Sequence, residues 1–429
     1  MNITSNLEAA ALYFPDQIAF MDESRQLTYS DLNIEAMRIA SVLSKVGVSP
    51  GDHAAILLPN SCTWLAAYFG ILKAGAVAVT LPYIMTSKEL APVIDDSKPK
   101  VLFTDDAKLP AISSQNDIKC VIADHGDIGY DELVDDGSTW FETVQKEADD
   151  TCAILYTGGT TGLPKGVMLT HNNIMAAAFN VARYERSSEK DRALCFLPLN
   201  HVFAQIHIMH STILTAGGLV IQASFDMSAF LDAISRQNVT KLYSVPTVYT
   251  RLLSLDNLKE RLGPVRYCFS AAASMAKELV REWKSRTGLN IFEAYGMTES
   301  ASMVTYNHYY RHVVGSVGTP ANCVEVQIRD EKGKVLETGQ KGEICISGPN
   351  IMKGYLNREE DTRNAFWGKY FRSGDIGYID ENSHLYIVDR IKELIITGGE
   401  NVSPKEIEEV LYERHEIEEC AVIGLPDKE

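Results

Sequence analysis

The segment LYTGGTTGLPKGVMLT, residues 155–170, combines hydroxyl groups, glycines and one lysine in a way that suits phosphate binding. Backbone N–H groups and hydroxyls can surround phosphate oxygens, while a nearby ammonium group neutralises their charge. The Walker A pattern fails, because Lys165 follows Pro164 and Gly166 stands where that pattern has a Mg²⁺-binding hydroxyl. A plain glycine-rich turn would need fewer polar groups. The candidate phosphate-binding residues are Thr157, Gly158, Gly159, Thr160, Thr161, Gly162 and Lys165.

Three histidines, His201, His207 and His210, form a second group whose residue type could do chemistry. A spacing of three places His207 and His210 on one face of a helix, as in some metal sites. No Cys, Asp or Glu in the same segment completes a set of metal ligands. We therefore expect packed histidines here rather than a metal centre.

These candidate residues lie on a chain in which short apolar runs alternate with amphipathic helical segments over the first three hundred residues. Runs such as HAAILLP, TCAILYT and VRYCFS are typical of strands in parallel sheets that helices cover on both faces. After about residue 312 the strands become shorter and alternate, which predicts a small antiparallel sheet or barrel. From Lys392 the pattern returns to strand, helix and strand. We therefore expect an α/β fold.

The composition is that of an ordinary globular protein of 429 residues. A net charge of −17 disfavours nucleic acid as a partner. The eight cysteines are scattered without a CxxC pair, and we interpret them as single buried thiols of a cytoplasmic protein. The stretch from Trp64 to Met85 imitates a membrane span. Because Lys73, two glycines and Pro82 interrupt it, we expect a helix followed by a buried strand and no transmembrane segment.

Five motifs in a fixed order make the chain resemble the adenylate-forming superfamily, which includes acyl-CoA synthetases, aryl-CoA ligases, firefly luciferases and peptide-synthetase adenylation domains. The motifs are YTGGTTGLPKGVMLTH (156–171), YGMTES (295–300), GEICISGPNIMKGYLN (342–357), YFRSGDIG (370–377) and DRIKELIITGGENVSPKEIE (389–408). The resemblance implies a large N-terminal domain, residues 1–391, of two doubly wound sheets with a small β-barrel at about 313–390. Residues 392–429 would begin an incomplete α+β C-terminal domain.

Members of this superfamily use ATP to convert a carboxylic acid to an acyl-adenylate and then usually pass the acyl group to a thiol. The resemblance assigns Tyr295 to stacking on adenine, Thr298 to the α-phosphate, and Glu299 to Mg²⁺, which prefers carboxylate oxygen. It assigns Asp375 to the ribose hydroxyls, Arg390 to the ribose or a phosphate, and Lys392 to an interdomain hinge. The catalytic candidates are Lys165, His201, Thr298 and Glu299. Further nucleotide contacts are expected from Ala272, Ala273, Gly296 and Met297.

The acid-binding pocket is expected around NHVFAQ (200–205), which resembles the segment whose histidine gates the acyl site. FSAAASM (269–275) replaces the usual Gly-Gly-Ala-Pro-Leu run and keeps the site small and apolar, which favours fatty or aryl acids. The pocket candidates are His201, Phe203, Ala204, Ala271, Gly296 and Met297. Asp226 and Ser228 of FDMS are interpreted as helix N-caps. The resemblance places the aspartate that binds an amino group within HVFAQ, which has no carboxylate, so an amino-acid substrate is disfavoured.

The leading hypothesis is an AMP-forming acyl-CoA synthetase for a fatty or similar hydrophobic acid, using ATP, Mg²⁺ and coenzyme A. Members of the superfamily carry a catalytic lysine beyond the position of Glu429, so we expect a shortened chain that adenylates slowly. One alternative is an aryl-CoA ligase, and another is a ligase that loads the phosphopantetheine of an acyl carrier protein. A third is a catalytically weak protein that binds nucleotide or acyl-adenylate. The sequence does not decide between a monomer and a homodimer.

Overall fold

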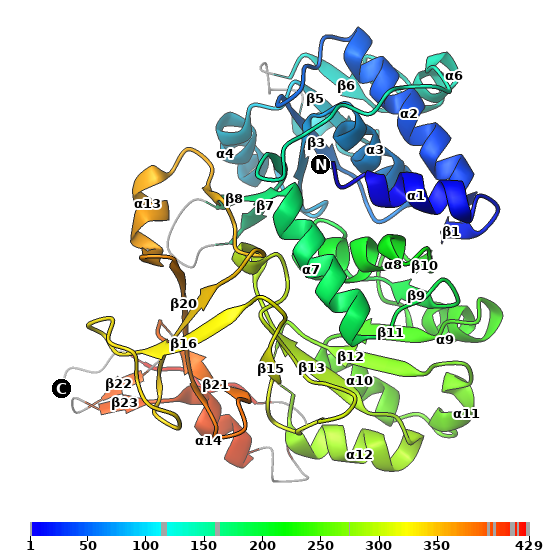
Figure 1. Ribbon diagram of the computed structural model, residues 1–429. Coiled ribbons are helices and arrows are strands. Elements are labelled where there is room, and N and C mark those ends of the chain that lie inside the picture. The colour runs from blue at the N-terminus through cyan, green and yellow to red at the C-terminus, as the bar shows by residue number, and fades with distance from the viewer. Residues whose placement is uncertain are drawn as a thin grey trace.

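The computed structural model describes residues 2–112, 118–158, 164–273, 275–392, 395–397, 400–411, 417 and 420–425. It confirms the predicted α/β class: two large mixed sheets and a smaller, curled antiparallel sheet (Figure 1). The antiparallel sheet, in yellow and orange, lies beside the two large sheets and close to the last described elements of the chain.

The first large sheet has seven strands with a parallel centre. In sheet order they are β18 (Gly354–Tyr355), β8 (Lys165–Thr170), β7 (Thr151–Thr157), β4 (Val77–Thr80), β3 (His53–Leu57), β5 (Val101–Thr104) and β6 (Cys120–Ile122). The helices in this half are α1 (Ser5–Tyr13), α2 (Tyr29–Lys45), α3 (Cys62–Lys73), α4 (Ser87–Ser97), α5 (Leu109–Ile112) and α6 (Tyr130–Asp136). In β3, Ala54 and Ile56 face the core of α2 and α3, whereas Ala55 and Leu57 face α4. Both faces are buried, which explains the continuous apolar run.

The second large sheet has nine strands, again with a parallel centre. In sheet order they are β15 (Thr319–Pro320), β14 (Thr305–Tyr306), β13 (Ile291–Tyr295), β12 (Tyr267–Ser270), β11 (Lys241–Ser244), β9 (Arg192–Cys195), β10 (Gly218–Ile221), β1 (Ile18–Met21) and β2 (Gln26–Thr28). Its outer face carries α9 (Met227–Arg236), α10 (Pro246–Leu253), α11 (Leu258–Leu262) and α12 (Lys277–Thr287). Leu242 and Cys268 face these helices, while Tyr243 and Phe269 face the central core.

Three helical elements, α7 (His171–Tyr184), η1 (Phe203–His210) and α8 (Ser211–Leu214), contribute to the core that the two large sheets share (Figure 1). A capping box starts α7: the Thr170 hydroxyl accepts the Asn173 N–H at 3.1 Å, and the Asn173 side chain accepts the Thr170 N–H at 2.9 Å. The element η1 is a π-helix, a rare form that is often found at functional sites.

The antiparallel sheet is the third sheet that borders the central region of the molecule, beside the two large sheets. Its strands are β16 (Glu325–Arg329), β17 (Gly342–Ser347), β19 (Phe366–Trp367), β20 (Tyr370–Ile379) and β21 (Leu385–Arg390), and α13 (Glu359–Asn364) precedes β19. Antiparallel pairing sets Asp375 of β20 opposite Arg390 of β21. Two residues that are fifteen positions apart in the sequence are thereby placed side by side.

The apolar stretch from Trp64 to Met85 forms most of α3 and all of β4, as predicted, and both elements are buried in the first sheet and its core. Lys73, at the end of α3, is buried with its ammonium group 2.5 Å from a carboxylate oxygen of Glu8. Among the described residues, every helix is too short or too polar to cross a bilayer.

The prediction that all cysteines are buried is wrong for two of the eight. Cys323 is exposed in the turn between β15 and β16, and Cys420 is half-buried. The turn has to reach the surface to connect two sheets, and Cys323 adopts a φ of 63° there. The other six are buried.

The chain after β21 continues with β22 (Ile395–Thr397), β23 (Glu400–Val402) and α14 (Pro404–Leu411). Strands β22 and β23 form an antiparallel hairpin. The Ser403 hydroxyl donates a hydrogen bond to an Asp389 carboxylate oxygen at 2.6 Å, which ties this segment to the end of β21. The domain boundary at residues 391 and 392 stays a prediction.

Candidate active site

The predicted site residues come together near the carboxyl ends of β7 and β13, next to the antiparallel sheet. Thr157 ends β7, Tyr295 ends β13, and Tyr295 reaches Asp375 of β20. The carboxyl edge of an open α/β sheet is where ligands usually bind, because loops diverge there and leave room between them. The three sheets therefore contribute side chains to one region.

Gly296 connects β13 to the short helix η2 (Thr298–Ser300) through a very tight turn. A Cβ atom at this position would lie 1.8 Å from the carbonyl oxygen of Ser302, so no other residue fits without moving the backbone. The next residues, Met297, Thr298 and Glu299, are half-buried. The tight turn thus explains why glycine stands at this position of the YGMTES motif. The same turn brings Thr298 and Glu299 close to the end of the strand.

Asp375 is the centre of the predicted ribose-binding group. Its carboxylate accepts a hydrogen bond from the Tyr295 hydroxyl at 2.5 Å and one from Arg390 Nε at 3.1 Å. Burial raises the pKa of the Asp375 carboxyl, while these two donors favour its ionised form. Tyr295 is itself buried, which raises the pKa of its hydroxyl and keeps it protonated as a donor. The carboxylate is held in one orientation, with most of the Arg390 side chain exposed beside it.

Lys165 begins β8 and lies in a small polar cluster with residues from a distant part of the chain. Its ammonium group is 3.0 Å from an Asp361 carboxylate oxygen and 5.0 Å from the centre of the Tyr355 ring. The Tyr355 hydroxyl donates to Glu299 at 2.9 Å. Lys165 and Glu299, predicted separately for phosphate and metal binding, are therefore connected through one tyrosine.

The phosphate loop is described only at its two ends. Gly159, Thr160, Thr161 and Gly162 lie outside the described residues, so their predicted contacts stay predictions. Thr157 is half-buried, and its hydroxyl donates to the Lys165 carbonyl at 3.4 Å across the β7–β8 pair. Gly158 is exposed, and a Cβ there would meet nothing within 4 Å, so no close approach requires glycine in this structure.

Glu299 suits the predicted Mg²⁺ on chemical grounds. Among the described residues, no group of three or more His, Cys, Asp or Glu side chains could enclose a metal ion. Mg²⁺ needs no such cage when a substrate brings phosphates, because it then binds through one or two carboxylates and keeps several waters. A half-buried carboxylate with one oxygen oriented by Tyr355 fits that mode of binding.

The predicted acid-binding residues divide into an exposed part and a buried wall. His201, Ala272 and Ala273 are exposed and Ala271 is half-buried, whereas Phe203 and Ala204 are buried in the core. The Phe203 N–H donates to His201 Nδ1 at 3.2 Å, so the second ring nitrogen carries the proton in the neutral imidazole. Although part of His201 is exposed, the protein packed around its imidazole removes water from the ring, which lowers the pKa of His201 and favours that neutral form.

Ala272 occupies a backbone conformation that ordinarily favours glycine. Its φ is 71°, in the left-handed region, which is uncommon for a residue with a Cβ. The FSAAASM segment therefore keeps a glycine-like turn although the glycines of the superfamily motif are missing. Strained backbone of this kind often occurs at ligand sites.

His207 and His210 have protein partners, in agreement with the prediction that they are packed histidines. His207 Nε2 lies 2.8 Å from Glu185, and His210 Nε2 lies 2.9 Å from the Tyr68 hydroxyl. Glu185 is fully buried and also bonds to the side chains of Lys241, Tyr243 and Tyr306. This buried network lies behind the aromatic wall formed by Phe203, Phe269 and the His207 ring.

The remaining predictions concern helix capping and the hinge. Asp226 caps α9 by accepting the Ala229 N–H at 2.8 Å, as expected, while Ser228 lies inside the first turn and is not the cap. The cap must precede the first helical residue, and that residue is Met227. Lys392 is exposed just after β21, and its role as a hinge stays a prediction.

Sequence reasoning missed Tyr355, Asp361 and Glu185. Tyr355 lies within a quoted motif, so its position could have been noted, but nothing in that motif indicates what its hydroxyl contacts. Asp361 is one of three consecutive acidic residues, a pattern that usually marks a solvated helix start. Glu185 has no local signal at all, because its partners lie 22 to 121 positions away.

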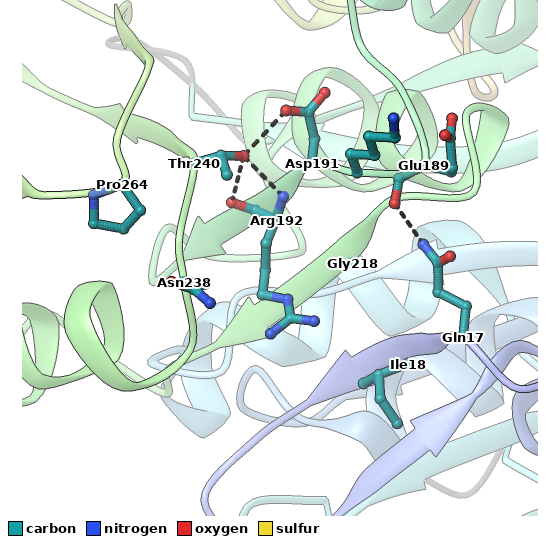
Figure 2. A pocket seen from close by; sticks show the side chains of 10 residues that line it. Gln17, Ile18, Glu189, Asp191, Arg192, Gly218, Asn238, Thr240 and Pro264 are labelled. Atoms are coloured by element: carbon teal, nitrogen blue, oxygen red, sulfur yellow. Dashed lines mark hydrogen bonds between the residues drawn. The ribbon is translucent and has the colours of Figure 1, made fainter.

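A recess lies at the opposite edge of the nine-stranded sheet (Figure 2). Its lining comes from the amino ends of β1, β9 and β10 and the approach to β11, through Ile18, Arg192, Gly218 and Thr240. Gln17 Nε2 donates to the Glu189 carbonyl at 2.7 Å across it. Because the predicted site residues lie at the carboxyl ends, this recess is separate from the candidate active site.

The fold and this arrangement of side chains define an α/β enzyme of the nucleotide-binding class. A family profile described as AMP-binding enzyme matches residues 7–356, and the chain belongs to that family. It is 34% identical over 418 residues to a feruloyl-CoA synthase of Amycolatopsis sp, covering 96% of this chain and 83% of that protein. It is 30% identical over 465 residues to a long-chain-fatty-acid–CoA ligase of Bacillus subtilis, covering 99% and 83%.

Comparison with solved structures also identifies acid–CoA ligases as similar proteins. The anthranilate CoA ligase AuaEII in complex with anthranoyl-AMP matches with a TM-score of 0.94 and 26% identity, covering 99% of this chain and 85% of that one. The similar proteins are thus acid–CoA ligases that act on chemically different acids.

Proposed function

We propose that this protein is an AMP-forming acid–CoA ligase whose substrate is a hydrophobic, fatty or similar carboxylic acid. The observation that carries the proposal is that Tyr295 and Arg390 both bond to Asp375, while Tyr355 connects Lys165 with Glu299, which follows β13. These are the side chains to which the proposal assigns the ribose, the phosphates and the metal of ATP. The aromatic wall of Phe203 and Phe269 supports an apolar acid. The names of similar proteins support coenzyme A as the acceptor.

In the first half-reaction, a carboxylate oxygen of the acid attacks the α-phosphorus of ATP, and the bond to the β-phosphate breaks to release pyrophosphate. Asp375 accepts the ribose hydroxyls, and Tyr295 contributes its ring to adenine. Lys165 and Thr298 bind phosphate oxygens, which is the positioning that such reactions depend on. Glu299 would hold Mg²⁺, and the bound ion would supply further charge neutralisation.

In the second half-reaction, the thiolate of coenzyme A attacks the acyl carbonyl carbon, and AMP leaves with the bonding electron pair. We assign His201 the gating role at the acid-binding region: its imidazole is favoured in the neutral form and accepts the Phe203 N–H, so it can move aside without separating a charge from a partner. Lys392 follows β21 at the point where a hinge would let the end of the chain turn toward this face.

The test is ATP–pyrophosphate exchange with a panel of acids: straight-chain fatty acids of increasing length, benzoate and cinnamate types, dicarboxylates and amino acids. We expect exchange with the apolar acids and loss of exchange in Glu299→Gln. Exchange confined to dicarboxylates or amino acids would contradict the assigned substrate class. Thioester formation with coenzyme A, compared with acyl transfer to a carrier protein, then identifies the acceptor.

A further inference from the structure

Residues 352–356 connect the two halves of the candidate phosphate and metal site. The Met352 N–H donates to the Glu299 carbonyl at 2.8 Å, and the Leu356 N–H donates to the Gly166 carbonyl at the same distance. Between these points, Gly354 and Tyr355 form β18 and pair with β8. This segment is therefore held at one end by η2 and at the other by the strand that carries Lys165.

Tyr355 lies in the middle of this segment with its backbone fixed. Its N–H donates to the Thr362 hydroxyl at 2.9 Å, and its antiparallel partner in β8 is Val167. Its side chain is half-buried and packs against the central core. A side chain anchored in this way has little freedom to leave its position when a ligand enters.

The two ends of the Tyr355 side chain contact two different functional groups. The hydroxyl donates to Glu299 at 2.9 Å, and burial, followed by the charge of Glu299, raises the pKa of that hydroxyl and keeps it a donor. The ring lies 5.0 Å from the Lys165 ammonium group, within the range of a cation–π contact. One residue thus orients both a carboxylate and an ammonium group.

We propose that Tyr355 is a positioning residue that couples the phosphate-binding Lys165 to the metal-binding Glu299. The inference rests on the proposed function, since it takes the roles of Lys165 and Glu299 from there. The hydroxyl sets the direction of the Glu299 carboxylate toward the metal, and the ring holds Lys165 beside it. Because the two contacts use different parts of the side chain, substitutions can separate them.

Calorimetry measures the affinity for an α,β-methylene analogue of ATP. The titration is done with excess Mg²⁺, at a series of Mg²⁺ concentrations, and in EDTA without free Mg²⁺. This readout does not require turnover. Tyr355→Phe removes the hydroxyl and keeps the ring. We expect the Mg²⁺ concentration at half-saturation to rise about ten-fold, which is the lower end of the loss in metal affinity seen when a hydrogen-bond partner of a metal ligand is removed. Affinity in EDTA should stay within two-fold of the original protein.

Tyr355→Leu removes the ring as well. We expect it to show the same shift in Mg²⁺ dependence and, in addition, about three-fold weaker binding in EDTA, as for a partly exposed cation–π contact. Thermal melting followed by circular dichroism establishes that each variant is folded. If Tyr355→Leu fails to fold, Tyr355→Phe alone still decides the coupling to Glu299.

Tyr370→Phe is the matched control, because Tyr370, which lies in the antiparallel sheet and not in the sheet of Tyr355, makes the same two kinds of contact. Its hydroxyl donates to Glu325 at 2.7 Å, and Lys369 lies 5.2 Å from its ring. We expect this variant to bind nucleotide and Mg²⁺ as the original protein does. If Tyr355→Phe behaves like Tyr370→Phe, the proposed coupling is overturned.

Lys165→Met and Glu299→Gln separate a failure of this inference from a failure of the proposed function. Both should weaken binding of the Mg²⁺–nucleotide analogue. If they weaken it and Tyr355→Phe does not, only the role of Tyr355 is wrong. If neither weakens it, the roles assigned to Lys165 and Glu299 are wrong, and the coupling is overturned with them.

Discussion

Asp375 combines two requirements that oppose each other at the level of a single residue. In the ribose-binding role that we propose for Asp375, its carboxylate has to be ionised, yet it is almost completely buried, and burial favours its neutral form. The Tyr295 hydroxyl and Arg390 compensate by donating to the charged form. Ribose hydroxyls would replace or share these donors, so the carboxylate is oriented before the nucleotide arrives.

Replacing this carboxylate with an amide should weaken nucleotide binding. We expect Asp375→Asn to lower the affinity for AMP and for the ATP analogue by about ten- to one hundred-fold, because hydrogen bonds to a charged group contribute about 1.5–3 kcal/mol. Calorimetric titration measures this directly. Glu325→Gln is the control, since Glu325 also bonds a tyrosine hydroxyl and pairs with a basic residue, Lys369. Equal losses in both variants would point to a general effect on the sheet.

At the scale of elements, helix α13 supplies a competing partner for the phosphate-loop lysine. Asp361, in its first turn, lies 3.0 Å from the Lys165 ammonium group, and both side chains are a little over one-third exposed. Such a pair is weak, and nucleotide phosphate can replace it. In the proposed site, Asp361 would therefore compete with the phosphates of ATP for the Lys165 ammonium group, while the Tyr355 ring stays beside it.

Removing the charge of Asp361 should therefore tighten nucleotide binding. We expect Asp361→Asn to increase the affinity for the ATP analogue by up to about five-fold, because an exposed ion pair contributes at most about 1 kcal/mol. The gain should shrink as salt is added, because ions screen the original pair. Glu359→Gln removes an equal charge from an exposed position in the same turn of α13. If both variants tighten binding equally, net charge and not the ion pair is the cause.

At the scale of the whole molecule, buried histidines connect the protein's stability to pH. His171 starts α7, and its Nδ1 atom accepts the Ile3 N–H at 3.1 Å, which ties the beginning of the chain to the central core. Burial lowers the pKa of His171 to about 4, and burial lowers that of His210 to about 3. Both are neutral in the folded protein at pH 7.

The sign of the pH effect follows from these lowered pKa values. Below about pH 6.5 the unfolded chain binds a proton at His171 that the folded chain does not, so stability falls as the pH drops toward 4. A shift of this size corresponds to about 3 kcal/mol. Urea unfolding at pH 7.5 and pH 4.5 should show a smaller loss for His171→Asn, which keeps an acceptor but does not titrate.

His125 provides the matched control for this measurement. It is exposed, and Asp106 raises the pKa of its imidazole, so its protonation favours the folded protein as the pH falls; removing it should therefore not reduce the acid-dependent loss of stability. If His171→Asn loses as much stability on acidification as the original protein, proton uptake at His171 does not contribute.

The sequence by itself determined the features that depend on neighbouring residues. Apolar runs such as β3 predicted buried parallel strands, and Asp226 predicted a helix start. Lys73 and Pro82 interrupt the apolar stretch between Trp64 and Met85, so the sequence predicted no transmembrane helix there. Strand periodicity, helix capping and the order of motifs are all local, and a residue contributes to them through its own neighbours in the chain. The family and the class of nucleotide site followed from those motifs.

Only the tertiary structure decided which distant side chains meet. Tyr355 contacts a carboxylate 56 positions and a lysine 190 positions away, and Glu185 bonds to four side chains spread from His207 to Tyr306. Such contacts depend on strand order and on how the sheets pack around the shared core, which no local pattern encodes. Residue types therefore sufficed to predict the chemistry of the site, whereas the contacts between its parts required the fold.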